Sequence, residues 1–267
     1  MPMPWIGLSP SIINDMNTRK LIGIRMFFLM ALVLMSEVSK ADIVRVAVAS
    51  NFSATLKRLV AGFEAENNHK VLISSASTGK LFAQIVRGAP FDIFFSADAR
   101  RADLLLKKNI AISSELYAKG QLVYIAQAVK QDQCFNNLAS DKVNRIAIAN
   151  PKIAPYGFAA AEVLKKLGLW EAYRHRLLMG ENILQTYQFI ATGNVGAGFV
   201  ARSTAIKSKE LRGFCRWQVP ANLHQPIKQK MAVLKKAGNK SVVQNFRKYI
   251  KSEKARKIIL ESGYAVE

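Results

Sequence analysis

The sequence predicts an α/β fold of two lobes joined by crossing strands, with a ligand cleft between them. Short apolar segments alternate with segments in which apolar residues recur at helical spacing. This alternation predicts a parallel sheet with helices on both faces. The 267 residues suit two lobes of ordinary size, and no internal repeat or long linker separates them. Half of the residues are hydrophobic, which excludes a disordered chain.

The first part of the chain begins with an apolar run and continues with helical spacing. Residues 43–49 are apolar enough for a buried strand, and Leu56, Leu59 and Phe63 then recur as on one face of a helix. A later helix stops at the turn-forming residues 88–90. The same alternation predicts strands at 71–75 and 91–95 and helices through 81–86 and 102–107.

The alternation continues in the rest of the chain. Residues 196–200 carry two glycines spaced two apart, which predicts a buried strand that packs closely against its neighbours. Further strands are predicted at 122–126, 145–149 and 230–234, and helices at 159–167, 242–250 and 258–260. Asp92 in the third strand, and Ser96 and Asp98 just after it, are expected to cap and orient the next helix rather than to act in catalysis.

The N-terminal segment has the pattern of a secretory signal peptide. Arg19, Lys20 and Arg25 precede an apolar run at 26–35, and small residues then occupy the two positions that a signal peptidase reads, Ser39 and Ala41. The apolar run has about half the length of a membrane-spanning helix. We therefore expect residues 1–41 to be a cleaved signal peptide and the mature protein to be periplasmic.

The chain is strongly basic, with 39 Lys and Arg against 18 Asp and Glu. Removing residues 1–41 takes away four basic and two acidic residues, which leaves 35 and 16 and a formal charge of +19. Such a charge favours an anionic partner, whether a small oxyanion, a polyanion or a membrane surface. The alternative is a generally basic exported protein with no partner implied.

Two cysteines, Cys134 and Cys215, remain in a compartment that permits disulfides. Their separation is not a metal-ligand spacing, and two cysteines do not make a disulfide scaffold. Pairing and two free thiols both stay open at this point.

Three predicted strands run into turns of small polar residues, each followed by a helix start. Ser50 and Asn51 form the first turn, Ser77 and Thr78 the second, and residues 150–157 the third. Free backbone N–H groups at a helix start, joined by neutral hydroxyl donors, make a site for an anion. In open α/β sheets ligands bind beyond the carboxyl ends of strands, where these turns fall. The alternative is that the polar side chains only cap helices.

Six segments, in chain order, resemble the periplasmic molybdate-binding proteins of ABC transporters. The resemblance extends from about residue 43 to residue 264, and each segment alone would be a weak signal. The segments are V-A-V-A-S-N-F, S-S-A-S-T-G-K-L-F-A-Q-I, R-G-A-P-F-D-I-F-F-S-A-D, I-A-N-P-K-I-A-P-Y-G, T-G-N-V-G-A-G-F-V-A and V-P-A-N-L-H-Q-P-I-K-Q.

The resemblance implies the two-lobed periplasmic-binding-protein fold and a transport function. Residues 42–121 would form the first part of lobe 1, residues 122–226 lobe 2, and residues 227–267 the return to lobe 1. Such a protein captures molybdate or tungstate and delivers it to the ABC transporter permease in the inner membrane. It acts as a monomer, is not an enzyme, and needs no cofactor and no nucleic acid.

The resemblance also implies a set of ligand-binding positions. The protein would hydrogen-bond to the oxygens of the molybdate or tungstate ion. No protein atom would coordinate the molybdenum or tungsten itself. Carried over by position, the ligand-binding residues are Ser50 with Asn51 beside it, Thr78 next to Ser77, and the backbone N–H groups of Tyr156 and Ile183.

One position departs from the family pattern. Some members add a tyrosine hydroxyl after the G-F-V strand, where this chain has Ala201. One donor is therefore unaccounted for, and the side chains of Asn51 and Tyr156 are the candidates to replace it.

The chemistry of the turns agrees with the resemblance. Molybdate near neutral pH is a dianion with four acceptor oxygens and no proton, so a site of donors alone suits it. None of the three turns contains Asp or Glu, whose carboxylates would repel the ion. Neutral donors also avoid the desolvation cost of burying Lys or Arg. Because sulfate shares the charge and shape of molybdate, selection against it would depend on cavity size.

Three other functions are alternatives to this one. Another tetrahedral oxyanion, such as sulfate or phosphate, would use the same kind of site. An exported hydrolase needs a nucleophile, a base and an orienting group, and none of His69, His175 and His224 lies beside a hydroxyl or cysteine motif. A polyanion binder would explain the charge, but the chain lacks the usual nucleic-acid recognition motifs.

Overall fold

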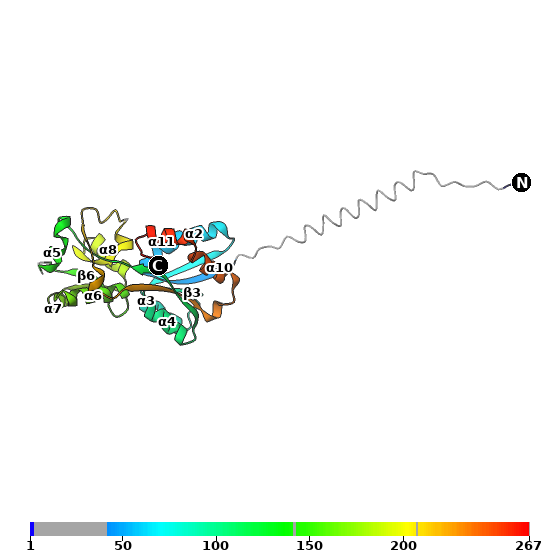
Figure 1. The fold of residues 1–267 in the computed structure, drawn as a ribbon, viewed down its shortest axis with the longest axis horizontal. Helices are drawn as coiled ribbons and strands as arrows, with labels where there is room; N and C mark the ends of the chain where they lie inside the picture. The colour runs from blue at the N-terminus through cyan, green and yellow to red at the C-terminus, as the bar shows by residue number, and fades with distance from the viewer. Residues whose placement is uncertain (3–41, 141–142, 207, 267) are drawn as a thin grey trace. The chain divides into compact units, whose positions relative to one another are not determined.

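The computed structural model describes residues 1–2, 42–140, 143–206 and 208–266 (Figure 1). The predicted signal peptide, residues 1–41, lies outside them apart from its first two residues. Residues 41–267 form one unit. No helix within the described ranges has both the length and the apolar character needed to cross a membrane.

The strands of the described residues form two five-stranded sheets, and the first has the order β2-β1-β3-β10-β4. Its strands are β1 (Ile43–Ala49), β2 (Lys70–Ala76), β3 (Ile93–Ser96), β4 (Ala111–Gly120) and β10 (Ile227–Leu234). β1 is parallel to β2 and β3, whereas β10 is antiparallel to both β3 and β4. The expectation of a parallel sheet therefore holds for β1, β2 and β3 but not for β10, which enters this sheet from the opposite end when the chain returns from the second sheet.

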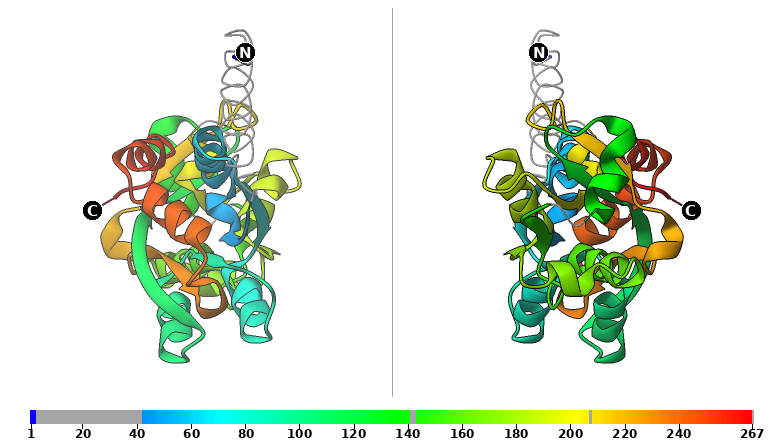
Figure 2. Two further views of the ribbon diagram at one scale, coloured as in Figure 1. Left: turned by 90° about the vertical axis from the view of Figure 1, so that its right-hand side faces the viewer. Right: turned by 90° about the vertical axis from the view of Figure 1, so that its left-hand side faces the viewer.

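Helices cover both faces of the first sheet. One face carries α2 (Ser53–Glu66), α10 (Ser241–Ile250) and α11 (Glu253–Glu261), and the other carries α3 (Thr78–Val86) and α4 (Ala99–Lys107). Figures 1 and 2 show the orange and red C-terminal helices in the same lobe as the blue first strand. The core of this lobe therefore contains residues from early and late parts of the chain. For example, Phe63 of α2 packs edge-on against Phe246 of α10.

The second sheet repeats this plan, with the order β7-β6-β8-β5-β9. Its strands are β5 (Leu122–Ala126), β6 (Ile146–Ala149), β7 (Leu177–Gly180), β8 (Ala197–Ala201) and β9 (Cys215–Gln218). β6 is parallel to β7 and β8, and β5 is antiparallel to β8 and β9. This sheet is also mixed.

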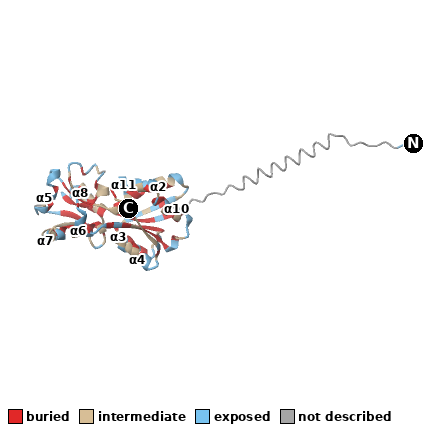
Figure 3. Cartoon of the chain, viewed as in Figure 1, coloured by how far each residue is buried: buried red, intermediate tan, exposed pale blue. Residues whose placement is uncertain are grey.

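The second sheet is likewise covered on both faces. One face carries α5 (Cys134–Ala139), α6 (Pro155–Lys166) and α7 (Trp170–Tyr173), and the other carries α8 (Ile183–Ala191) and α9 (Arg202–Ala205). The inner strands β3, β5, β6 and β8 are buried along their whole length, and Figure 3 shows exposed residues on the outer parts of the helices. Short 3-10 helices lie at η1 (Ser50–Phe52), η2 (Gln131–Gln133), η3 (Ala221–Leu223) and η4 (Lys235–Ala237).

The chain crosses between the sheets twice. Gln121 alone joins β4 to β5, and residues 219–226 join β9 to β10. Each sheet, together with the helices that cover it, forms one lobe. The boundaries 42–121, 122–226 and 227–267 remain a prediction, because residues 41–267 form a single unit by their contacts.

The α/β class is confirmed, and two differences from the predicted elements have local causes. The elements β4, β7, β9, α5, α7, α8 and α9 lie where no element was predicted. β3 begins at Ile93 rather than at 91, since the Phe91 N–H still bonds to Ala89 O in the preceding turn, at 2.9 Å. α6 begins at Pro155, four residues before the predicted start, because proline suits the first helical position. Asp98 caps α4 as expected by accepting from Arg101 N at 2.8 Å.

Asp92 has a different role from the one expected. Its carboxylate accepts from Arg45 N at 2.7 Å and pairs with Lys240 Nζ at 2.8 Å, so it links β1 to the segment before α10. The expectation that Asp92 helps to cap the next helix is therefore wrong. Ser96 bonds to the Asp98 N–H at 3.2 Å and so orients the capping residue.

Cys134 and Cys215 form a disulfide that joins α5 to β9 within the second lobe. Their Cα atoms are 5.5 Å apart, and both cysteines are buried. Of the two outcomes that the sequence left open, the structure has the paired one.

We predict that replacing both cysteines, as Cys134→Ser with Cys215→Ser, lowers the free energy of unfolding by about 2–5 kcal/mol, because the bridge closes a long loop in the unfolded chain. Chemical denaturation with and without reductant measures the effect. Reductant should destabilise the natural protein and leave the double variant unchanged. Equal stability of the two oxidised proteins would contradict the prediction.

Candidate ligand-binding site

A small cavity lies between the two lobes, where strands end and helices begin. It holds about 190 Å³ of empty space, including its opening to solvent. All six predicted binding residues line it, and they are all buried. The lining residues are Ala49, Ser50, Asn51, Ser77, Thr78, Ala97, Ala154, Pro155, Tyr156, Asn182 and Ile183. The structure thus brings the six together, and their contact with a ligand remains a prediction.

Ser50 and Asn51 enter the cavity wall directly after β1. They form η1, and neither η1 nor α2 has a side-chain cap. The interpretation of these two residues as mere helix caps is therefore wrong. Ser50 Oγ makes no hydrogen bond to another described residue, so its O–H is available to a ligand in the cavity.

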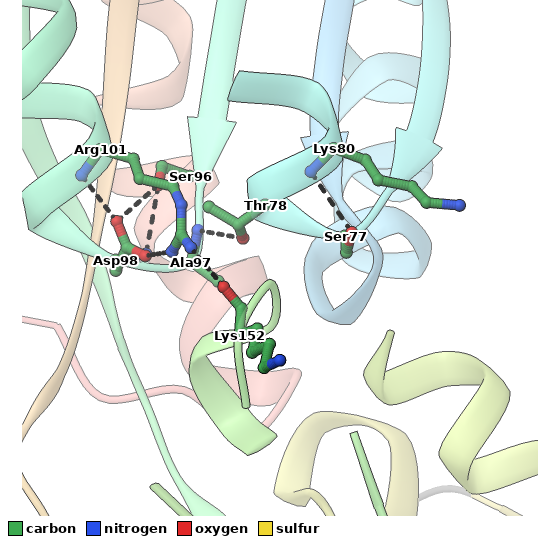
Figure 4. Close-up of polar contacts among 8 residues, drawn as sticks. All are labelled: Ser77, Thr78, Lys80, Ser96, Ala97, Asp98, Arg101 and Lys152. Carbon is green, nitrogen blue, oxygen red and sulfur yellow. Dashed lines mark hydrogen bonds and ion pairs between the residues drawn. The ribbon is translucent and has the colours of Figure 1, made fainter. Parts of the chain in front are cut away.

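The hydroxyls of Ser77 and Thr78 each accept a backbone N–H. Ser77 Oγ accepts from Lys80 N at 3.4 Å and so caps α3, as the alternative interpretation expected. Thr78 Oγ1 accepts from Ala97 N at 3.3 Å, and Figure 4 shows this bond beside the Asp98 and Arg101 pair. Because an accepting hydroxyl keeps its own proton, both residues retain an O–H to donate.

Two helix N-termini of the second lobe complete the wall. Tyr156 is the second residue of α6, and Ile183 is the first residue of α8. Asn182 caps α8 through Oδ1, which accepts from Leu184 N at 3.0 Å and Gln185 N at 3.1 Å. The first N–H groups of a helix have no acceptor within it, and the helix dipole makes this end positive. The N–H groups of Tyr156 and Ile183 are therefore suited to an anion.

The cavity wall carries donors but no full charge. Among the described residues that line it, none is Asp, Glu, Lys or Arg. Two ion pairs lie beside the lining residues, Asp98 with Arg101 and Lys80 with Glu181. In the described part of the chain, no group of three or more His, Cys, Asp or Glu is placed to hold a metal ion. An ion held here would be bound by hydrogen bonds to its own oxygens.

A buried polar network lies behind the wall and fixes Asn51. Its Nδ2 donates to Gln229 Oε1 at 2.8 Å and to Tyr264 Oη at 3.2 Å, and Tyr264 Oη donates to Asn51 O at 2.6 Å. Both amide hydrogens are used within the protein. The amide of Asn51 therefore does not supply the donor missing at Ala201, which is buried at the end of β8 and is not part of the lining.

Sequence reasoning missed several residues of the site. Ala97 follows β3 at the same sheet edge as the predicted turns, and that position in the pattern could have indicated it. Gln229 and Tyr264 belong to β10 and to the chain end, and no local pattern links them to Asn51. Their contact depends on the return of the chain to the first lobe.

Gln229 also hydrogen-bonds to the hydroxyls of Tyr117 and Tyr156, and burial raises the pKa of all three tyrosines in this network. The pKa of Tyr117 and that of Tyr156 lie well above the ordinary value, mainly because removal from water disfavours the phenolate. The same cause raises the pKa of Tyr264 to about 12. These hydroxyls therefore keep their protons at neutral pH and act as hydrogen-bonding groups.

Known proteins resemble this chain in sequence. The family model described as bacterial extracellular solute-binding protein matches residues 44–265. The chain is 40% identical over 232 residues to the molybdate-binding protein ModA of Azotobacter vinelandii, covering 86% of this chain and 92% of that protein. It is 39% identical over 224 residues to ModA of Rhodobacter capsulatus, covering 83% and 87%.

Solved structures show the same relationship. The periplasmic molybdate-binding protein of Azotobacter vinelandii superposes with a TM-score of 0.77 at 35% identity and covers 84% of this chain and 99% of that one. The sulfate-binding protein SubI of Mycobacterium tuberculosis H37Rv superposes with a TM-score of 0.71, covering 84% and 86%, but its 12% identity shows the fold alone.

The fold and the neutral cavity between two lobes define a solute-binding protein. The chain belongs to the family of bacterial extracellular solute-binding proteins, which includes these molybdate-binding proteins. The expectation of a two-lobed periplasmic-binding-protein fold is thereby confirmed.

We predict that stability falls at alkaline pH because of the buried tyrosines. An unfolded tyrosine ionises near pH 10, whereas the pKa of native Tyr264 is raised to about 12. The native state thus holds a proton that the unfolded state releases. The free energy of unfolding should therefore be unaffected by this group below about pH 10 and fall between about pH 10 and 12.

Denaturant unfolding at a series of pH values checks this, with Tyr264→Phe as the comparison. The free energy of unfolding of this variant should fall less at alkaline pH than that of the natural protein. Ultraviolet titration of the native protein gives a second measurement. Ionisation of every tyrosine near its ordinary pKa would contradict the prediction.

Proposed function

We propose that this protein captures molybdate or tungstate in the periplasm and delivers it to an ABC transporter permease in the inner membrane. The observation that carries the proposal is the buried cavity lined by neutral donors from both lobes. Its hydroxyls, Ser50, Ser77 and Thr78, and its two helix N-termini match an ion that has acceptor oxygens and no proton. That the ion contains molybdenum is inferred from the relatives, which are named as molybdate-binding proteins.

The number of donors is compatible with useful affinity. Each hydrogen bond to a charged group contributes about 1.5–3 kcal/mol. About five to seven such bonds, less the cost of association, correspond to micromolar to nanomolar binding. Phosphate suits the cavity less well, since near neutral pH it carries a proton, and no carboxylate among the described lining residues could accept it.

Direct contacts across the mouth hold the two lobes together around the cavity. Gly79 N donates to Ile153 O at 2.9 Å, and Arg101 Nη2 donates to Lys152 O at 3.1 Å, as Figure 4 shows for the second of these bonds. A Cβ at Gly79 would lie 3.0 Å from Ile153 Cα, so glycine permits this approach. Lobe closure would enclose the ion and form the surface that a permease recognises.

The remaining parts of the proposal concern location and partners. Residues 1–41 act as a cleaved signal peptide, and the mature protein works as a monomer without cofactor or catalytic activity. The excess of basic residues over acidic ones raises the rate at which dianions are captured. Neither a hydrolase nor a nucleic-acid function is favoured by the site or by the family.

Isothermal titration calorimetry on the mature protein tests the ligand. We expect molybdate and tungstate to bind in the micromolar range or tighter, and sulfate and phosphate to bind much more weakly. Binding of sulfate or phosphate in the absence of any response to molybdate and tungstate would reassign the ligand.

We predict that Ser50→Ala and Thr78→Ala each weaken molybdate binding roughly tenfold or more, because each removes one charge-assisted hydrogen bond. Thr78→Ser keeps the hydroxyl and should retain most of the affinity. Ser75→Ala, at an exposed position of β2 outside the cavity, is the matched control. Unchanged affinity in both alanine variants would show that the ligand lies elsewhere.

A further inference from the structure

The side chain of Gln229 lies behind the cavity and contacts both of its halves. It belongs to β10, two residues after the strand begins at Ile227, and it is completely buried. Its Oε1 accepts from Asn51 Nδ2 at 2.8 Å, and its Nε2 donates to Tyr156 Oη at 3.2 Å. Asn51 belongs to the first lobe and Tyr156 to the second, so one amide links cavity residues of the two lobes.

The position requires a group that both accepts and donates. Oε1 of Gln229 accepts a second hydrogen bond from Tyr117 Oη at 2.9 Å, so this end of the amide faces two donors. The other end faces the oxygen of Tyr156. Glutamate would lose the donor and bury a charge, and an apolar side chain would lose both functions and leave its partners unsatisfied.

The link between Gln229 and Tyr156 lies directly against the place where the chain crosses between lobes. A Cβ added at Gly120, the last residue of β4, would lie 2.3 Å from Tyr156 Oη and 2.8 Å from Gln229 Nε2. The crossing strand therefore leaves these two groups little room to move. Through Gln229, hydrogen bonds connect Tyr156 at the start of α6 to Asn51 in η1.

We infer that Gln229 is a positioning residue for the anion site, which it does not itself touch. It holds the Ser50–Asn51 turn through Asn51 and the N-terminus of α6 through Tyr156, so that donors from the two lobes converge on one ion. The inference rests on the proposed function. It adds a residue of the β10 strand to the machinery that determines affinity.

A double-mutant cycle tests this inference. Gln229→Met keeps the size of the side chain and removes both hydrogen-bonding functions, and Tyr156→Phe removes only the partner hydroxyl and keeps the backbone N–H in the cavity. We expect each single variant to weaken molybdate binding roughly tenfold. Because both changes break the same link, the double variant should be weakened little more than the weaker-binding single variant.

Gln244→Met, on α10 and away from the cavity, is the matched control, since its amide also makes a part-buried hydrogen bond, to Gly238 O at 2.8 Å. Calorimetry is done at a temperature where thermal unfolding shows every variant to be folded. If Gln229→Met does not fold, Gln229→Glu and Tyr156→Phe take its place, and both should bind molybdate more weakly than the natural protein.

Three outcomes would overturn the inference. One is unchanged affinity of the folded Gln229 and Tyr156 variants together with lower unfolding temperatures, which would show a structural role only. Another is full additivity of the two losses. A third is an equal loss of affinity in Gln244→Met. Failure of the natural protein to bind molybdate would instead refute the proposed function, so the two failures are distinguishable.

Discussion

The candidate site depends on backbone N–H groups for which the described part of the chain supplies no acceptor. The first turn of every helix has such groups, and here α6 and α8 of one lobe begin beside the cavity that Ser50 and Thr78 of the other lobe also line. Buried donors are costly unless an acceptor meets them. An oxyanion with several acceptor oxygens removes that cost, and it would do so for both lobes at once.

This constraint explains why the cavity is neutral. Two helix N-termini already give a positive potential, so a buried Lys or Arg is not needed to attract a dianion, and its desolvation would be costly. Two ion pairs lie beside the lining instead, Lys80 with Glu181 across the lobes and Asp98 with Arg101. Discrimination between oxyanions then depends on the geometry of the donors. The hydrogen bonds of Gln229 to Asn51 and Tyr156 hold these lining residues in place.

Much of the fold could be predicted because the local signals were strong. The run at β1 and the helical spacing in α2 are determined by burial. The start of α6 at Pro155 and the whole of α8, which follows its cap Asn182, were not predicted, although proline and asparagine are typical of helix starts. β4 was missed, because Ser113, Ser114 and Glu115 interrupt its apolar pattern and its pairing with β10 alone places it at a sheet edge. The mixed strand directions were also missed, since direction depends on how the chain returns and not on the residues of one strand.

The sequence by itself determined the turns that follow the strands, their hydroxyl and amide residues and the absence of carboxylates among them, because these are properties of short segments. Only the tertiary structure decided that the six predicted residues meet in one cavity, that Cys134 pairs with Cys215, and that the Asn51 amide is occupied by Gln229 and Tyr264. Those contacts join residues far apart in the chain. The geometry of the contacts follows from the two crossings of the chain between lobes and from the close packing where the lobes meet.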